Sequence, residues 1–155
     1  MERTLVLIKP DAMQRGLIGE IMHRFERKGL KLIGLKMYTL NDELIDEWYG
    51  HHKGKSFFAD LKSYMQWTPI VAIVWEGLDA ITTVRKIVGI TKGREADTGS
   101  IRGDFGMSGQ QNLIHASDSV EAAQKEIGLI FDESELFTYL SASECLIYGE
   151  EERKA

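Results

Sequence analysis

The hydrophobic positions of the chain fall into short continuous runs separated by more polar, periodic stretches. Runs of aliphatic and β-branched residues at 4–8, 30–38 and 70–75 predict strands, and shorter runs at 112–116 and 145–148 predict two more. The first run is unbroken, as expected of a strand that is buried on both of its faces. We therefore expect a β-sheet at the centre of the fold.

Between these runs, apolar residues recur at the spacing of one helical face. Helices are predicted at about residues 17–28, 44–48, 57–64, 81–88, 119–127 and 133–140. The expected N-caps are Asn41 or Asp42, Ser56, Asp79, and Ser117 or Ser119, and the expected C-cap is Gly29. At Lys9-Pro10-Asp11 the sequence favours a turn.

The stretch 90–111 differs from the rest because it holds five glycines and no sustained periodicity. We expect a long loop there, with at most short helical pieces. Loops longer than about 15 residues in compact domains are usually functional or disordered.

The predicted element order is β-α-β, an inserted helical pair, and β-α-β again. This is the split βαβ or ferredoxin-like plan, an α+β sandwich in which helices pack on one face of an antiparallel sheet. We expect a single domain over residues 1–149, followed by a charged, solvated tail at 150–155.

Composition narrows the classes of function. The 155 residues include 19 Lys and Arg against 24 Asp and Glu, a net charge of −5, which argues against nucleic acid or an anionic membrane as the main partner. The one cysteine, Cys145, excludes an internal disulfide framework and a cysteine-based metal site. No apolar run is long enough to span a membrane, and the first residues lack the pattern of a secretion signal. The sequence therefore predicts a cytoplasmic protein.

Four histidines are the first candidates for chemistry. His23 lies among charged residues in a predicted helix and is expected at the surface. His51 and His52 are adjacent and have no carboxylate or cysteine at ligand spacing, so we do not expect a metal there. His115 lies at the end of a strand and precedes the start of a helix, where anions bind. It is either a nucleophile or base, or a core histidine bonded to the backbone.

Three cationic side chains help to decide whether His115 is catalytic or structural. Lys9 follows four aliphatic residues, Arg85 lies on a predicted helix, and Arg102 lies in the glycine-rich loop. If they converge on His115 they form a phosphate pocket, because Arg and Lys both bind phosphoryl oxygens. If they do not converge, they are ordinary surface partners of carboxylates.

Several strings of residues, in order along the chain, resemble the nucleoside diphosphate kinase family. They are Leu7-Ile8-Lys9-Pro10-Asp11, Gln14-Arg15-Gly16, Val74-Trp75-Glu76-Gly77, Ser100-Ile101-Arg102-Gly103-Asp104-Phe105 and Asn112-Leu113-Ile114-His115-Ala116-Ser117-Asp118-Ser119. The resemblance extends from Glu2 to Tyr148, and the last string is highly specific to the family. It implies the ferredoxin-like fold that the element order also predicts.

The resemblance implies a ping-pong phosphoryl transfer. A nucleoside triphosphate gives its γ-phosphate to His115, forming a pros-phosphohistidine, and a nucleoside diphosphate then collects it. By resemblance, Glu126 orients the imidazole with Ser117 nearby, and Tyr49 lies beside the histidine. A neutral imidazole suits this chemistry because it is a nucleophile without losing a proton.

The remaining site residues are also implied by the resemblance. Lys9, Arg85 and Arg102 hold the phosphates with the hydroxyl of Thr91, and Lys9 and Asn112 contact the sugar. Phe57 stacks on the base with Leu61 beside it, and because every base has a π-face we predict broad base and sugar specificity. Mg²⁺ is expected on the nucleotide phosphates without direct protein ligands. The family also implies a homo-oligomer, either a hexamer or a tetramer.

The chain departs from the family pattern near the site. Ala116 stands where the family usually has glycine after the histidine, and Gly109 stands where it has an aliphatic residue opposite the base. Gln110 and Gln111 replace a usual Gly-Arg pair, which removes a cation. Two other functions stay open: a degenerate member that binds nucleotides without turnover, and a sheet that binds RNA, which the net charge disfavours.

Overall fold

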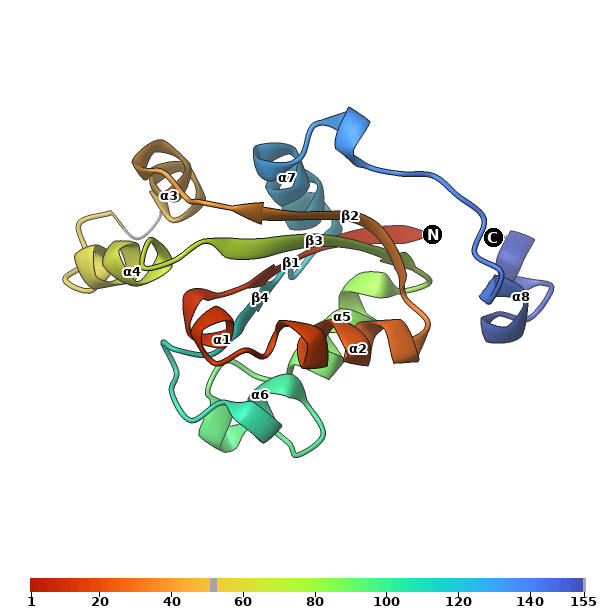
Figure 1. The fold of residues 1–155 in the computed structure, drawn as a ribbon, viewed down its shortest axis with the longest axis horizontal. Coiled ribbons are helices and arrows are strands. Elements are labelled where there is room, and N and C mark those ends of the chain that lie inside the picture. The colour runs from red at the N-terminus through yellow and green to blue at the C-terminus, as the bar shows by residue number, and fades with distance from the viewer. Residues whose placement is uncertain (51–52, 155) are drawn as a thin grey trace.

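The computed structural model describes residues 1–50 and 53–154, and it is built around a four-stranded sheet (Figure 1). The strands are β1 (Glu2–Ile8), β2 (Lys31–Tyr38), β3 (Ile70–Gly77) and β4 (Ile114–Ala116). Their order across the sheet is β2-β3-β1-β4, and all neighbours are antiparallel. The ferredoxin-like α+β plan is confirmed.

Eight α-helices and three single 3₁₀ turns are found in the described residues. The helices are α1 (Pro10–Gln14), α2 (Ile18–Lys28), α3 (Asp42–Trp48), α4 (Phe58–Met65), α5 (Ala80–Val88), α6 (Ile101–Phe105), α7 (Val120–Ile130) and α8 (Glu144–Ile147). The 3₁₀ turns are η2 (Gly93–Glu95), η3 (Glu133–Glu135) and η4 (Glu152–Lys154). The 90–111 stretch is thus a loop with two short helical pieces, as predicted.

Side-chain caps define several helix ends. The side chain of Asn41 accepts from the amide of Leu44, and that of Ser119 accepts from the amide of Ala122. Each bond satisfies an amide that the helix itself leaves unpaired. Gly29 ends α2 at φ 96°, a left-handed conformation that suits glycine. Ser56 does not cap α4, because that helix begins one residue later than predicted, after Phe57.

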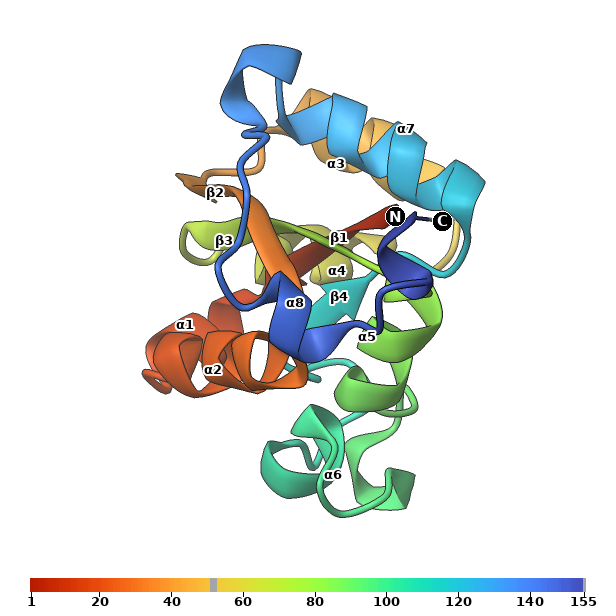
Figure 2. The ribbon, with the colours of Figure 1, turned by 90° about the vertical axis from the view of Figure 1, so that its right-hand side faces the viewer.

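Helices cover both faces of the sheet, so the expectation of helices on one face was wrong (Figures 1 and 2). The α2 and α5 helices lie on one side, and α3 and α7 lie on the other. The cause lies in the strands: the last five residues of β1 are all buried, so consecutive side chains on opposite faces both need cover.

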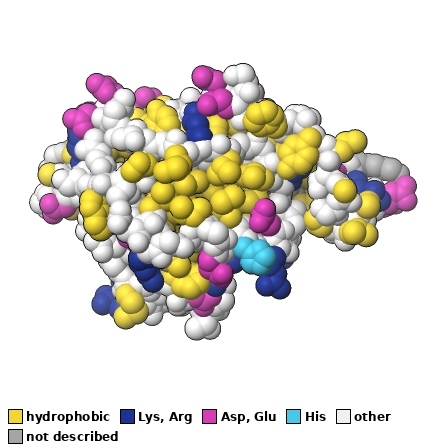
Figure 3. Space-filling view, viewed as in Figure 1, with side chains coloured by type: hydrophobic (Ala, Val, Ile, Leu, Met, Phe, Trp, Pro, Cys, Tyr) yellow, Lys and Arg dark blue, Asp and Glu magenta, His cyan; other side chains and the backbone are white. Residues whose placement is uncertain are grey.

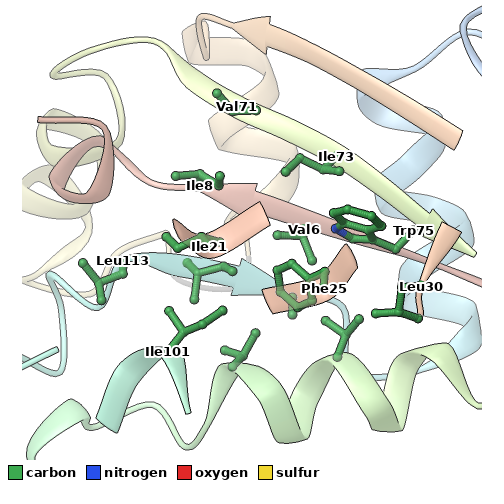
Figure 4. Packing of buried hydrophobic residues seen from close by; sticks show 14 of the residues in the cluster. Val6, Ile8, Ile21, Phe25, Leu30, Val71, Ile73, Trp75, Ile101 and Leu113 are labelled. Atoms are coloured by element: carbon green, nitrogen blue, oxygen red, sulfur yellow. The ribbon is translucent and has the colours of Figure 1, made fainter. Parts of the chain in front are cut away.

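The core layer beneath α2 and α5 is centred on two aromatic rings (Figure 4). Phe25 of α2 and Trp75 of β3 are fully buried, with ring centroids 5.4 Å apart and planes tilted by 42°. Val6, Ile8 and Ile73 of the central strands pack in the same cluster. This layer fixes α2 to the sheet.

Three predictions of secondary structure were wrong. The expected turn at Lys9-Pro10-Asp11 is the start of α1, because Pro10 suits the first position of a helix. The expected helix at 133–140 is one 3₁₀ turn at η3, and the expected strand at 145–148 is the short helix α8. The 3₁₀ turn η4 lies within the predicted solvated tail.

The reason lies in the C-terminal segment after α7. Its apolar side chains Phe137, Leu140 and Leu146 are 63%, 95% and 86% exposed, so their spacing marks no buried face. The amide of Phe137 donates to the carbonyl of Ile33 at 2.8 Å, and the hydroxyl of Tyr139 donates to the carbonyl of Leu32. The segment runs past β2 toward α2 (Figure 2).

Truncating Phe25 to alanine is expected to lower the free energy of unfolding by about 3–5 kcal/mol, because it leaves a cavity against Trp75. Urea titration followed by circular dichroism measures this. The matched control is Phe137→Ala, whose exposed ring should contribute less than about 0.5 kcal/mol. Equal losses for the two variants would contradict the assignment of Phe25 to the core.

Candidate active site

One cavity of about 680 Å³ gathers the residues that the sequence singled out. This volume suits a small-molecule ligand. All ten side chains assigned to the nucleotide or to the chemistry line it: Lys9, Tyr49, Phe57, Leu61, Arg85, Thr91, Arg102, Asn112, His115 and Glu126. The eleventh, Ser117, lies behind Glu126 and bonds to it. The three cations and His115 therefore converge.

Sheet register directs His115 into this cavity. His115 pairs with Leu7 across β4 and β1, so the two side chains share one face of the sheet. Leu7 belongs to the core layer under α3 and α7, whereas Ile114 and Ala116 belong to the other layer. The imidazole therefore projects toward α3 and α7, which carry Trp48 and Glu126, and toward Tyr49 directly after α3.

A carboxylate fixes the imidazole from one end. Nε2 of His115 lies 3.0 Å from Oε2 of Glu126, and the hydroxyl of Ser117 donates to the same oxygen at 2.6 Å. An ionised carboxylate only accepts, so this contact assigns the imidazole proton to Nε2 and the lone pair to Nδ1. Nδ1 makes no hydrogen bond to any described residue. It is thus available as a nucleophile.

Lys9 is buried beside the cavity, where its ammonium donates to Oδ1 of Asn112 at 2.7 Å. Burial, and then the positive charge of Arg102, lower the pKa of Lys9 to about 8, while Asp11 opposes the shift. A neighbouring anion would raise the pKa of Lys9 again, because it stabilises the charged ammonium. The cavity therefore favours a negatively charged ligand.

Arg102 is also buried. It lines the cavity and also donates hydrogen bonds to backbone carbonyls. Its guanidinium donates to the carbonyls of Asn112, Gly89 and Ile114, at 3.2, 2.9 and 2.6 Å. Burial, and then the nearby charge of Arg85, lower the pKa of Arg102 to about 10. Since three of five guanidinium hydrogens are used this way, two remain for a ligand.

The backbone just before His115 is strained. Leu113 is fully buried and has φ 73°, a conformation that a bulky residue adopts only when its surroundings enforce it. Its amide donates to the carboxylate of Asp11, and its carbonyl accepts from the amide of Lys9. Asp11 in turn accepts from the hydroxyl of Tyr64 at 2.6 Å. By contrast, Ala116 has no positive φ, so its methyl group causes no backbone strain.

Tyr49 directly follows α3, and Phe57 directly precedes α4. Burial, and then the charge of Glu126, raise the pKa of Tyr49 to about 12, so its hydroxyl stays protonated and can donate. Phe57 is 45% exposed and lines the cavity together with Leu61, Gly109 and Gln110. An exposed ring at a cavity wall can stack on a flat ligand.

Two residues at the site, Asp118 and Trp48, have no role that the sequence pattern predicts. Asp118 lines the cavity, and it lies in the string that carries the resemblance. The ring of Trp48 contacts the imidazole of His115, and the only feature of the sequence that could have indicated this was its place next to Tyr49.

His23 is exposed as predicted, whereas His51 and His52 lie outside the described residues. Within 1–50 and 53–154, no three His, Cys, Asp or Glu side chains group as metal ligands.

Comparison with known proteins gives the same family along almost the whole chain. The model of the family "Nucleoside diphosphate kinase" matches residues 2–136. A nucleoside diphosphate kinase of Parabacteroides distasonis is 49% identical over 152 residues, which cover 98% of this chain and 99% of the relative. The chain belongs to the nucleoside diphosphate kinase family. It is an enzyme of the phosphotransferase class that uses nucleotides.

Solved structures support the same assignment. A nucleoside diphosphate kinase from Halobacterium salinarum, solved in complex with CDP, superposes with a TM-score of 0.92 at 44% identity. The match covers 96% of this chain and 99% of that one. A family member from Babesia bovis superposes with a TM-score of 0.91. Among the described residues, no helix of this kinase is long and apolar enough to cross a membrane.

The lowered pKa of Lys9 predicts that nucleotide binding takes up protons above pH 8. At pH 8.5 Lys9 is mostly neutral in the free enzyme, and phosphate oxygens return its pKa toward the ordinary value, so binding should take up roughly half a proton or more. Titration calorimetry with ADP in two buffers of different ionisation heat measures the uptake.

Lys9→Met should remove most of this uptake, because the titrating group is gone. Identical binding heats for the unmodified enzyme in both buffers would contradict the assignment of the shifted pKa to Lys9.

Proposed function

We propose that this kinase transfers the γ-phosphate of a nucleoside triphosphate to a nucleoside diphosphate through a phosphohistidine on Nδ1 of His115. The observation that supports it most directly is the imidazole itself, held through Nε2 by Glu126 and facing a cavity with three cations. A protein that only binds nucleotides needs the cations but has no use for an oriented nucleophile.

The transfer balances in two half-reactions. The lone pair of Nδ1 forms the N–P bond while the bond from phosphorus to the bridging oxygen breaks, and the nucleoside diphosphate leaves with that electron pair. An acceptor diphosphate then attacks the phosphohistidine, and Nδ1 recovers its lone pair. Glu126 keeps the proton on Nε2 throughout and stabilises the positive charge that develops on the ring.

The cations align the phosphates during both steps. Lys9, Arg85 and Arg102 line the same cavity as His115, and a loose transition state for phosphoryl transfer needs mainly this alignment and charge. Thr91 adds a hydroxyl and Tyr49 a protonated phenol near the histidine. Asn112 bridges Lys9 to the loop carbonyls of Thr91 and Gly109, so we place it and Lys9 at the sugar.

We propose that Mg²⁺ enters with the nucleotide. Mg²⁺ keeps several waters and binds through phosphates with few carboxylates, and the cavity offers few. Glu126 is engaged by His115 and Ser117, which leaves Asp118 as the other carboxylate on the cavity wall. When bound, the ion neutralises phosphate charge; Asp118 would reach it most simply through water.

Broad specificity follows from the way the base is held. Phe57 offers a ring face at the mouth of the cavity, with Leu61 beside it, and a ring face accepts any base. Gly109 and Gln110 also line the cavity, and they offer the base a small and a polar neighbour. We expect purine and pyrimidine nucleotides, with ribose or deoxyribose, to be substrates.

We propose that the enzyme is a homo-oligomer, a hexamer or a tetramer. The β2 strand lies at one edge of the sheet, where Leu35 and Met37 are 48% and 64% exposed. Figure 3 shows hydrophobic side chains gathered across the middle of the face on which β2 and β3 run in Figure 1. The segment after α7 bonds to this strand at Leu32 and Ile33, and a strand edge that is exposed beyond such a segment pairs readily with another copy. The cytoplasmic location stays a prediction from composition.

Labelling with γ-labelled ATP and Mg²⁺ tests the proposal directly. The intact enzyme should take up acid-labile, base-stable label that moves to GTP when GDP is added. His115→Ala should take up none, whereas His23→Ala, an exposed histidine on α2, should behave as the intact enzyme does. Label that persists in His115→Ala would refute the assignment, and no label in the intact enzyme would favour the function of binding without turnover.

Glu126→Gln should lower kcat at least about tenfold, because an amide can donate to Nε2 and thereby place the imidazole proton on Nδ1. Single-turnover phosphorylation measures the effect, and KM for ATP should change little. The matched control is Glu121→Gln, which alters an exposed carboxylate on the same helix and should leave the rate unchanged.

A further inference from the structure

Trp48 contacts the catalytic imidazole from outside the nucleotide cavity. It is the last residue of α3, and its ring lies 5.4 Å from that of His115 between centroids, with the planes at 80°. This edge-to-face arrangement is a favourable geometry for two aromatic rings. Trp48 does not line the cavity, so it acts on the histidine and not on the substrate.

The hydrogen bond from Nε2 to Glu126 does not by itself hold the plane of the imidazole, so the ring needs a second restraint. Nε2 is on the far side of the ring from Cβ, so the hydrogen bond to Glu126 opposes rotation about the Cβ–Cγ bond only weakly. That torsion is intrinsically broad. Rotation about it sweeps Nδ1 away from the direction of the cavity.

The support for Trp48 is itself rigid. The α3 helix is capped by Asn41 and buries Leu44 and Ile45, and Trp48 packs against the same core layer. The amide of Tyr49 donates to the carbonyl of Ile45 at 2.8 Å, which continues the helical bonding past Trp48. The indole therefore forms a fixed wall beside the imidazole.

We propose that Trp48 is a positioning residue, whose indole blocks rotation of the His115 ring and keeps Nδ1 aimed at the phosphate to be transferred. Its role rests on the proposed phosphohistidine. Trp48 and Glu126 then restrain different properties of the imidazole. Glu126 fixes which nitrogen carries the proton, and Trp48 fixes the plane of the ring.

The same contact makes Trp48 a reporter of the phosphoenzyme. A phosphoryl group on Nδ1 adds negative charge close to the indole, which should change its fluorescence. The other two tryptophans are placed differently: Trp75 is fully buried in the opposite core layer, and Trp67 is 59% exposed after α4.

Rapid mixing with ATP and Mg²⁺ tests the role in the full-length enzyme. Trp48→Leu keeps an apolar side chain but removes the flat ring, and it should slow phosphorylation of His115 about tenfold while the Kd for ADP stays unchanged. Trp48→Phe should restore most of the rate. Trp67→Leu is the matched control and should keep the full rate. An unchanged rate in folded Trp48→Leu, or a loss that appears in the Kd alone, would overturn the proposal.

Fluorescence gives a second readout that does not depend on how well Trp48→Leu folds. On phosphorylation, emission should change in the unmodified enzyme and in Trp67→Phe, but not in Trp48→Phe. A change that persists in Trp48→Phe would assign the signal to another tryptophan and contradict the proposed contact. The two proposals fail separately: label that remains in His115→Ala refutes the phosphohistidine, whereas a Trp48 effect can be absent in an enzyme that labels normally.

Discussion

Three buried charged side chains hold the backbone that carries His115, and the rest of the site depends on them. Asp11 accepts from the amide of Leu113, Arg102 donates to the carbonyls of Asn112 and Ile114, and Lys9 binds the side chain of Asn112. Together they enforce the left-handed conformation of Leu113. Buried charges are costly unless they are paired and hydrogen-bonded, and here the strained chain supplies the partners.

This arrangement connects binding to chemistry. Lys9 and Arg102 use some donors on protein atoms and still line the cavity, so the groups that shape the strand before His115 also face the phosphates. Burial is the main cause of the lowered pKa of both side chains, and a neighbouring cation lowers each pKa further: Arg102 acts on Lys9, and Arg85 acts on Arg102. The negative charge of substrate phosphates would offset the positive charge of Lys9 and Arg102.

Sheet architecture explains how distant segments meet. The β1 strand is central, so the residues that follow it reach both the 112–114 backbone and α4, where Tyr64 binds Asp11. Helices on both faces then add separate groups: α7 carries Glu126, α3 ends in Trp48, and α5 carries Arg85. The departures at Ala116 and Gly109 leave these contacts intact, because Ala116 keeps an ordinary strand conformation and Gly109 offers its carbonyl to Asn112.

The sequence by itself predicted the four strands of the sheet and most of the helices, and its resemblance to the family singled out most of the residues that the structure gathers around one cavity. Hydrophobic periodicity is a local property, and the string around His115 is distinctive enough to identify the family. The hydrophobic pattern mispredicted the segment after α7, where exposed apolar residues have the spacing of a buried helix and strand. Only the tertiary structure decided the positive φ of Leu113, the depressed pKa of Lys9 and the contact of Trp48 with His115. Each of these arises between segments far apart along the chain, so no local pattern encodes it.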